Sequence, residues 1–325
     1  MLLNITGLLV GFIIIVFSAD FFVKGTAAIA RNFGISPLII GLTIVGLGTS
    51  APEILVASMA SIQGNTGLAT GNAIGSNIAN IGLVLGFTAI VSPILIQSSI
   101  LKRELPVLLV ISIASYLLLI DGNLSRVDGF ILLAGLVGFL YWLARTAQQS
   151  RAQSIDTLDV EFSEEIPSNI PNSKAFVFFL LGLIGLIVSS KIIVWAAVNI
   201  AESFGISDLV IGLTIVAIGT SLPELAASIA SVLKKEPDLA IGNIIGSNAF
   251  NLLAVLSVPG LIHPGAIESQ LISRDIPIML GITLLLFFFS YSSTGQPKIG
   301  RFKGFLFAIL FITYLGKVYL DTIGI

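Results

Sequence analysis

The sequence of 325 residues contains no cysteine, one histidine and little charge, since Asp, Glu, Lys and Arg make up only 10% of it. The lack of cysteine excludes thiol chemistry, and a single histidine excludes the paired histidines of many hydrolytic metal sites. Soluble proteins carry about 25% charged residues. With 55% hydrophobic residues and a net charge of −2, this chain lacks both a wettable surface and a basic face for nucleic acid. We predict an integral membrane protein that is not an enzyme and holds no cofactor.

Long apolar segments alternate with short polar ones along the chain. A membrane-spanning helix needs about 20 mostly apolar residues, and ten segments meet this requirement: 5–30, 37–61, 67–91, 103–120, 127–145, 175–201, 209–232, 239–261, 274–290 and 302–320. One long acidic stretch, residues 146–173, divides them into two sets of five. The sequence therefore predicts an all-α membrane protein of ten transmembrane helices, with a first unit at 1–145, a hydrophilic linker at 146–173 and a second unit at 174–325.

The two units are copies of one another. The sequence GISPLIIGLTIVGLGTSAPE at 34–53 returns as GISDLVIGLTIVAIGTSLPE at 205–224, and GNAIGSNIAN at 71–80 returns as GNIIGSNAFN at 242–251. Both pairs are separated by 171 positions, which indicates an internal duplication. Because each copy has an odd number of spans, the second enters the membrane from the opposite side. We therefore predict inverted repeats related by a pseudo-twofold axis in the membrane plane.

The distribution of basic residues predicts the orientation in the membrane. Most Lys and Arg of the connecting segments fall on the side that holds the 146–173 linker. Lys and Arg favour the cytoplasmic side of a membrane. The linker is therefore predicted to be cytoplasmic, and both termini are predicted to lie outside.

Two glutamates, Glu53 and Glu224, lie inside apolar segments at matching positions of the two copies. An acidic residue at the centre of a membrane helix costs about 2.5–3.5 kcal/mol on insertion scales, and such residues usually mark ion pathways. A proline precedes each of them, and a proline frees a helical carbonyl one turn earlier. Freed carbonyls at membrane depth need a cation, water or other partner. The alternative is that both glutamates are protonated packing residues beside ordinary proline kinks.

A second repeated motif supplies amides and hydroxyls at a spacing of four residues, which places them on one helix face. Its members are Asn72, Ser76 and Asn80 in the first copy and Asn243, Ser247 and Asn251 in the second. Carboxylate, hydroxyl, amide and carbonyl oxygens are the ligands that calcium and other hard cations prefer. Because inverted repeats bring equivalent positions together near the bilayer midplane, the two motifs predict one cation-binding site between the central helices of the two copies.

The motifs GTSAPE and GTSLPE, each followed by GNxIGSNxxN, resemble the two alpha-repeats of the sodium/calcium exchangers, a branch of the calcium/cation antiporters. The chain length and short linker are most similar to the prokaryotic exchangers. Some members of that family carry Asp where this chain has Asn251, so this site has two formal negative charges. The resemblance implies ion ligation by Thr49, Ser50, Glu53, Ser76, Asn80, Thr220, Ser221, Glu224, Ser247 and Asn251, and by the backbone carbonyls near Gly46 and Ala217.

The resemblance also implies a function. We expect a single-chain antiporter in the plasma membrane of a prokaryote, surrounded by lipid, in which sodium moves down its gradient and drives calcium the other way. Helices 1 and 6 would slide across the other helices to alternate access. A proton/calcium antiporter that uses the same two glutamates is the nearest alternative, and potassium co-transport is a further variant. A channel is disfavoured because its symmetry axis usually runs along the pore.

Overall fold

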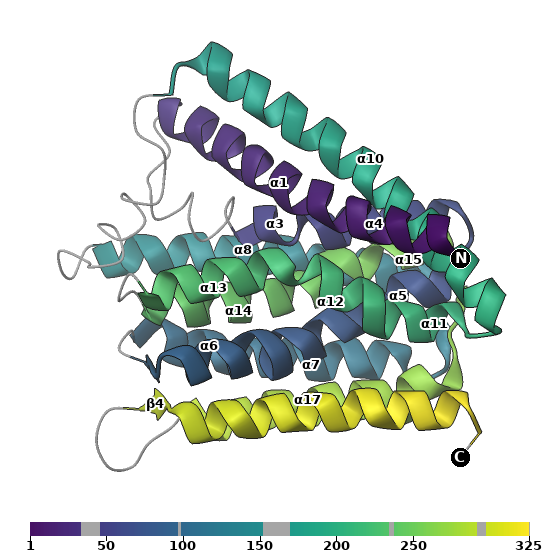
Figure 1. The fold of residues 1–325 in the computed structure, drawn as a ribbon. Helices are drawn as coiled ribbons and strands as arrows, with labels where there is room; N and C mark the ends of the chain where they lie inside the picture. Colours follow the sequence, from purple (N-terminus) through teal and green to yellow (C-terminus); the bar gives the residue numbers. More distant parts are fainter. Residues whose placement is uncertain (34–45, 97–98, 152–169, 234–236, 291–296, 325) are drawn as a thin grey trace.

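The computed structural model describes residues 1–33, 46–96, 99–151, 170–233, 237–290 and 297–324. Among them, eight helices are long and apolar enough to cross a membrane, so the prediction of a multi-pass helical membrane protein is confirmed (Figure 1). The first part of the predicted span 37–61 and residues 152–169 of the predicted linker lie outside the described residues.

Two long helices, α1 (Leu2–Asn32) and α10 (Asn172–Phe204), lie side by side and run obliquely across the others (Figure 1). Glycines bring their backbones into contact. A Cβ atom at Gly25 would lie 2.3 Å from the backbone nitrogen of Phe179, and one at Gly182 would lie 2.4 Å from that of Phe22. Small residues at helix crossings permit such close approach in membrane proteins. Any larger residue at Gly25 or Gly182 would force the two helices apart.

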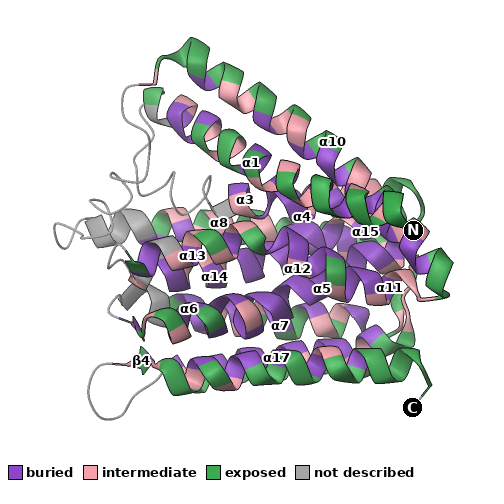
Figure 2. Ribbon diagram, viewed as in Figure 1, coloured by how far each residue is buried: buried purple, intermediate pink, exposed green. Residues whose placement is uncertain are grey.

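The remaining helices form a block of nearly parallel and antiparallel rods beneath this pair. Its most buried members are the central helices (Figure 2). The first half contributes α3 (Gly46–Thr49), α4 (Ala51–Ile62), α5 (Thr66–Ala79), the π-helical turn η2 (Asn80–Leu85), α6 (Gly86–Val91), α7 (Ser99–Leu119) and α8 (Arg126–Arg151). The second half contributes α11 (Asp208–Ile211), η3 (Gly212–Val216), α12 (Ala217–Thr220), α13 (Leu222–Leu233), α14 (Pro237–Phe250), η4 (Asn251–Val255), α15 (Ser257–Ile262), η5 (Leu271–Asp275), α16 (Ile276–Ser290) and α17 (Arg301–Thr322).

Several helices extend beyond the ends predicted from hydropathy. Helix α8 continues to Arg151, past the predicted end at 145. The hydroxyl of Thr146 donates a hydrogen bond to the carbonyl of Trp142, so the first polar residue after the apolar run is satisfied within the helix. Helix α7 likewise begins at Ser99 rather than at 103. Hydropathy therefore located the apolar part of these helices and missed their polar ends.

Short antiparallel strand pairs join the two halves of the chain. Strand β1 (Ile94–Leu95) pairs with β4 (Lys298–Ile299), and β2 (Asn123–Leu124) pairs with β3 (Gly265–Ala266). Strands β1 and β3 occupy positions 171 apart, so one strand of each pair comes from the same place in its half. The two strand pairs join loops that connect helices of this helical bundle. Within the described residues, none of the four strands belongs to a loop next to α1 or α10.

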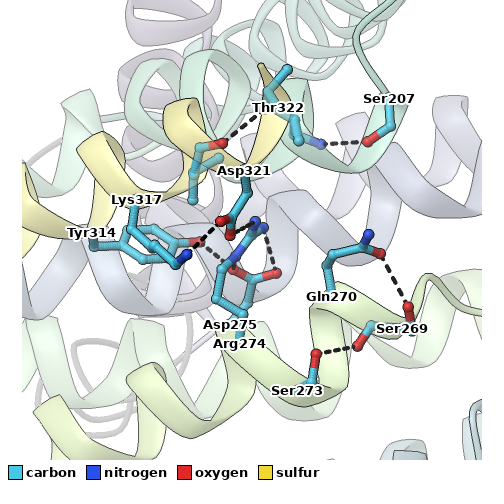
Figure 3. Close-up of polar contacts among 12 residues, drawn as sticks. Ser207, Ser269, Gln270, Ser273, Arg274, Asp275, Tyr314, Lys317, Asp321 and Thr322 are labelled. Atoms are coloured by element: carbon cyan, nitrogen blue, oxygen red, sulfur yellow. Dashed lines mark hydrogen bonds and ion pairs between the residues drawn. The ribbon is translucent and has the colours of Figure 1, made fainter. Parts of the chain in front are cut away.

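The duplicated acidic residues Glu104 and Asp275 are both buried but differ in their hydrogen-bond partners. Asp275 is fully buried and accepts hydrogen bonds from Arg274 at 2.7 Å and from the Tyr314 hydroxyl at 3.1 Å (Figure 3). Glu104, 171 positions earlier, is 4% exposed, and its Oε1 atom has no hydrogen-bond partner among the described residues. Burying a carboxylate that has no partner destabilises the folded protein. Removing one member of a buried ion pair also destabilises it, because the other member is left unpaired.

Neutralising these two acids should therefore change stability in opposite directions. Glu104→Gln is expected to raise the free energy of unfolding by about 1 kcal/mol, because it replaces a buried carboxyl group whose Oε1 atom has no hydrogen-bond partner among the described residues. Asp275→Asn is expected to lower it, because it leaves the Arg274 guanidinium short of one carboxylate. Chemical denaturation of the purified variants in detergent would measure both. The same sign of change in the two variants would contradict this interpretation.

Candidate ion-binding site

The two GTSxPE motifs form identical breaks in their helices. Ser50 lies between α3 and α4 with φ −85° and ψ 3°, and Ser221 lies between α12 and α13 with φ −83° and ψ 3°. Proline two residues later prevents the regular hydrogen bond across each break. Glu53 and Glu224 are thereby placed in the first turn of the helices that restart, α4 and α13. Helix N-termini favour negative charge, so the breaks suit the two carboxylates.

Threonines connect the breaks of one half to the amide-bearing helix of the other. The Thr49 hydroxyl lies 3.4 Å from the Ser247 hydroxyl and 3.4 Å from Oδ1 of Asn243. The equivalent Thr220 hydroxyl lies 3.5 Å from the Ser76 hydroxyl and 3.2 Å from Oδ1 of Asn72. Each residue of the first set has its counterpart in the second set 171 positions away. The helix breaks and the amide motifs of both halves therefore meet in one place.

The two carboxylates belong to the same cluster. Glu53 and Glu224 are both fully buried. The Ser247 hydroxyl donates to Oε1 of Glu224 at 3.4 Å. The Asn72 amide donates to the backbone carbonyl of Glu53 at 3.2 Å. Two buried carboxylates in one cluster need a cation or a proton to offset their charges.

Polar atoms without a hydrogen-bond partner concentrate at this cluster. The described residues contain thirteen such buried side-chain atoms, and eight of them belong to predicted ligands, so the concentration marks one location. Buried polar groups in proteins are nearly always paired, and a set of unpaired oxygens from several helices is what a cation would bind. The eight are Ser50 Oγ, Glu53 Oε1 and Oε2, Asn80 Oδ1, Ser221 Oγ, Glu224 Oε2, and Asn251 Oδ1 and Nδ2.

The two terminal asparagines of the amide motifs each begin a widened helical turn. Asn80 is the first residue of η2 and Asn251 the first of η4. The backbone N–H of Leu256 donates to the carbonyl of Asn251 at 2.9 Å, five residues back. π-helical turns interrupt α-helices mostly at functional sites. The periodicity of the sequence did not predict these turns, although the matching positions in both copies agree with a shared role.

The other predicted ligands have less complete environments. Gly46 and Ala217 are the first residues of α3 and α12. The Ala217 carbonyl already accepts the N–H of Ser221 at 3.1 Å and the hydroxyl of Thr220 at 3.4 Å. Thr49 is half-buried, whereas the side chains of Ser76, Thr220 and Ser247 are fully buried. The structure thus brings the described side chains of the predicted set together, while their role as ligands stays a prediction.

The side chain of one asparagine that the sequence analysis did not single out hydrogen-bonds to a predicted ligand, whereas that of its counterpart in the other copy hydrogen-bonds within its own helix. Asn248 follows the motif serine Ser247 directly, is fully buried and accepts a hydrogen bond from the amide of Asn80. Its counterpart Asn77 is 1% exposed, and its side chain donates to the carbonyl of Ala73 in its own helix. They too are 171 positions apart. The signal that could have found them was present, because both copies of the motif carry an asparagine at this position.

The whole helical region matches one protein family. The model of the family described as sodium/calcium exchanger protein matches residues 3–145 and 174–320. The chain belongs to the sodium/calcium exchanger family. It is therefore a membrane transporter of the calcium/cation antiporter class and not an enzyme, as the sequence motifs predicted.

Individual members of the sodium/calcium exchanger family are similar over almost their full length. CaxA of Alkalimonas amylolytica is 48% identical, with 96% of each chain covered, and the inner membrane protein YrbG of Escherichia coli is 43% identical, with 98% of each covered. Among solved structures, the sodium–calcium exchanger NCX_Mj superimposes with a TM-score of 0.68 at 36% identity, covering 97% of this chain and 98% of that one. The structural match and the family match therefore cover nearly the same part of the chain.

Proposed function

We propose that this exchanger couples sodium entry to calcium export, or the reverse, by alternating access to the site around Glu53 and Glu224. The observation that carries the proposal is the cluster of eight buried, unpaired polar atoms that centres on two carboxylates. Their donor set of carboxylate, hydroxyl and amide oxygens suits hard cations. The two negative charges would be balanced by one calcium ion or by two sodium ions, so the two cargoes would compete for one set of ligands.

The arrangement of the chain that this mechanism needs is ten spans in two inverted repeats, 1–145 and 174–325, with a cytoplasmic linker and both termini outside. The reciprocal contacts of Thr49 with Ser247 and of Thr220 with Ser76 support it, because a twofold relation exchanges these pairs. We place the protein in the plasma membrane of a prokaryote as a single functional chain. Helices α1 and α10 would slide over the block and expose the site to each side in turn.

Sodium is preferred over protons as the coupling ion for a chemical reason. Proton carriage would need only the two carboxylates, whereas this site adds hydroxyl and amide oxygens that ligate a metal ion and cannot carry a proton at neutral pH. The name of NCX_Mj, a sodium–calcium exchanger, agrees with this preference. A proton/calcium antiporter with the same two glutamates is the competing function.

Calcium-45 uptake into liposomes separates the two. Purified protein is reconstituted into liposomes loaded with sodium and diluted into sodium-free buffer. Matched liposomes contain potassium, or carry an imposed pH gradient without sodium. We expect uptake only in sodium-loaded liposomes, since only these have the driving gradient. Uptake that follows the pH gradient and ignores internal sodium would reject sodium coupling and favour the proton alternative.

A further inference from the structure

A chain of three asparagines runs from the first half of the protein to the second and back. The Asn248 side-chain amide donates to the backbone carbonyl of Asn77 at 3.4 Å. The Asn80 side-chain amide donates to Oδ1 of Asn248 at 3.0 Å. Asn80 and Asn248 are fully buried, and Asn77 is 1% exposed. Asn248 therefore stands between a fixed backbone group and a predicted ligand.

The hydrogen-bonding capacity of each group fixes the direction of this chain. A backbone carbonyl only accepts, so the group of Asn248 that faces Asn77 must be its NH₂ group. The oxygen of Asn248 then faces Asn80, and an amide oxygen also only accepts. Asn80 must therefore turn its own NH₂ group toward Asn248. Its oxygen points the other way, and that Oδ1 is one of the unpaired atoms of the ion-binding cluster.

The equivalent amide in the other half is not held in this way. The Asn77 side chain donates to the carbonyl of Ala73 in its own helix at 2.9 Å. Neither Oδ1 nor Nδ2 of Asn251 has a hydrogen-bond partner among the described residues. The two halves thus carry the same residues, but of the equivalent amides Asn80 and Asn251, Asn80 alone has a neighbour among the described residues that dictates which end faces the cluster.

From this geometry we infer that Asn248 is a positioning residue that orients the Asn80 amide with its oxygen toward the cation. The inference rests on the proposed function, in which Asn80 is a ligand. Outer-shell hydrogen bonds fix the orientation of metal ligands and are often worth roughly 10–100-fold in metal affinity. Without Asn248, the Asn80 amide could present its NH₂ group to the ion, which repels a cation.

Calcium binding to the purified protein tests the inference independently of transport. Titration calorimetry in sodium-free potassium buffer would be applied to wild type and to Asn248→Leu, with Asn248→Ala as a smaller substitution. We expect calcium affinity to fall about tenfold. Asn77→Leu is the matched control, because it alters the same position in the other half and leaves the Asn77 backbone carbonyl in place. Its affinity should stay near that of wild type.

A second variant, Asn80→Asp, tests whether Asn248 acts by orienting the Asn80 amide or by filling space. In Asn80→Asp the ligand is a carboxylate, which presents an oxygen whichever way it turns. Adding Asn248→Leu to this variant should cause no further loss of calcium affinity if Asn248 acts only through the Asn80 amide. An equal loss in both backgrounds, or wild-type affinity in Asn248→Leu, would overturn the inference, as would a wild type that binds no calcium. Wild type that binds calcium but shows no sodium-driven uptake would reject sodium coupling alone.

Discussion

Glu53→Gln and Glu224→Gln are each expected to reduce sodium-driven calcium uptake by more than about 100-fold, since even outer-shell partners of metal ligands are often worth roughly 10–100-fold in affinity. Both side chains are fully buried, and three of their four carboxylate oxygens have no hydrogen-bond partner in the part of the chain that the structure describes. Glutamine keeps the volume but removes a negative charge and one strong oxygen ligand. The calcium-45 liposome assay measures the loss.

Glu104→Gln is the matched control for this experiment. It makes the same chemical change at another buried glutamate, one outside the threonine and amide contacts of the ion-binding cluster. Its uptake should equal that of wild type. The assignment of Glu53 and Glu224 as central ligands would be abandoned if either glutamine variant exchanged ions at the wild-type rate. It would also be weakened if Glu104→Gln lost uptake to the same extent.

Arg274→Met is expected to lower the free energy of unfolding by about 3 kcal/mol, because removing one partner of a buried ion pair leaves an uncompensated charge. Arg274 makes two hydrogen bonds to the buried carboxylate of Asp275, at 2.7 and 3.1 Å, and a third to Asp321 at 3.0 Å (Figure 3). Lys317 also bonds to Asp321. Without the guanidinium, the hydroxyl of Tyr314 is the one hydrogen-bond donor left to the Asp275 side chain among the described residues.

The duplicated arginine supplies the control for that variant. Arg103 stands 171 positions before Arg274 and is exposed, so Arg103→Met should leave stability nearly unchanged. Chemical denaturation of both variants in detergent compares them directly. Equal destabilisation would show that the guanidinium of Arg274 contributes no more than an exposed one. Binding of calcium by folded Arg274→Met should persist, because the ion pair lies outside the site cluster.

The duplication made much of the site predictable from the sequence. A shift of 171 residues paired Glu53 with Glu224 and Thr49 with Thr220, and inverted symmetry predicted that such pairs meet. The family assignment followed from the same motifs and is confirmed by the family match. Apolar length predicted most of the helices, since the cost of burying polar groups in lipid leaves few other solutions.

The unpredicted features depend on how the helices rotate and pack. The sequence repeat makes Asn77 and Asn248 equivalent and cannot say which of them contacts the other half of the protein. In the structure, Asn248 hydrogen-bonds to Asn80 of the first half, whereas the Asn77 side chain hydrogen-bonds within its own helix. The partner of Asp275 on α17, Tyr314, is 39 positions away and has no periodic signal that links it to the acid. The ends of α8 and α7 were missed because polar residues continue a helix beyond its apolar stretch.

The glycine contacts between α1 and α10 bear on how the protein prevents uncoupled ion flux across the membrane. Because the backbones of these helices are in close contact at Gly25 and Gly182, we expect the two helices to move as one body. If this body covers one entrance as it uncovers the other, both entrances are never open together. Ions can then cross only as bound cargo. Substitutions that wedge the two helices apart are therefore expected to produce downhill sodium and calcium fluxes that no longer depend on each other.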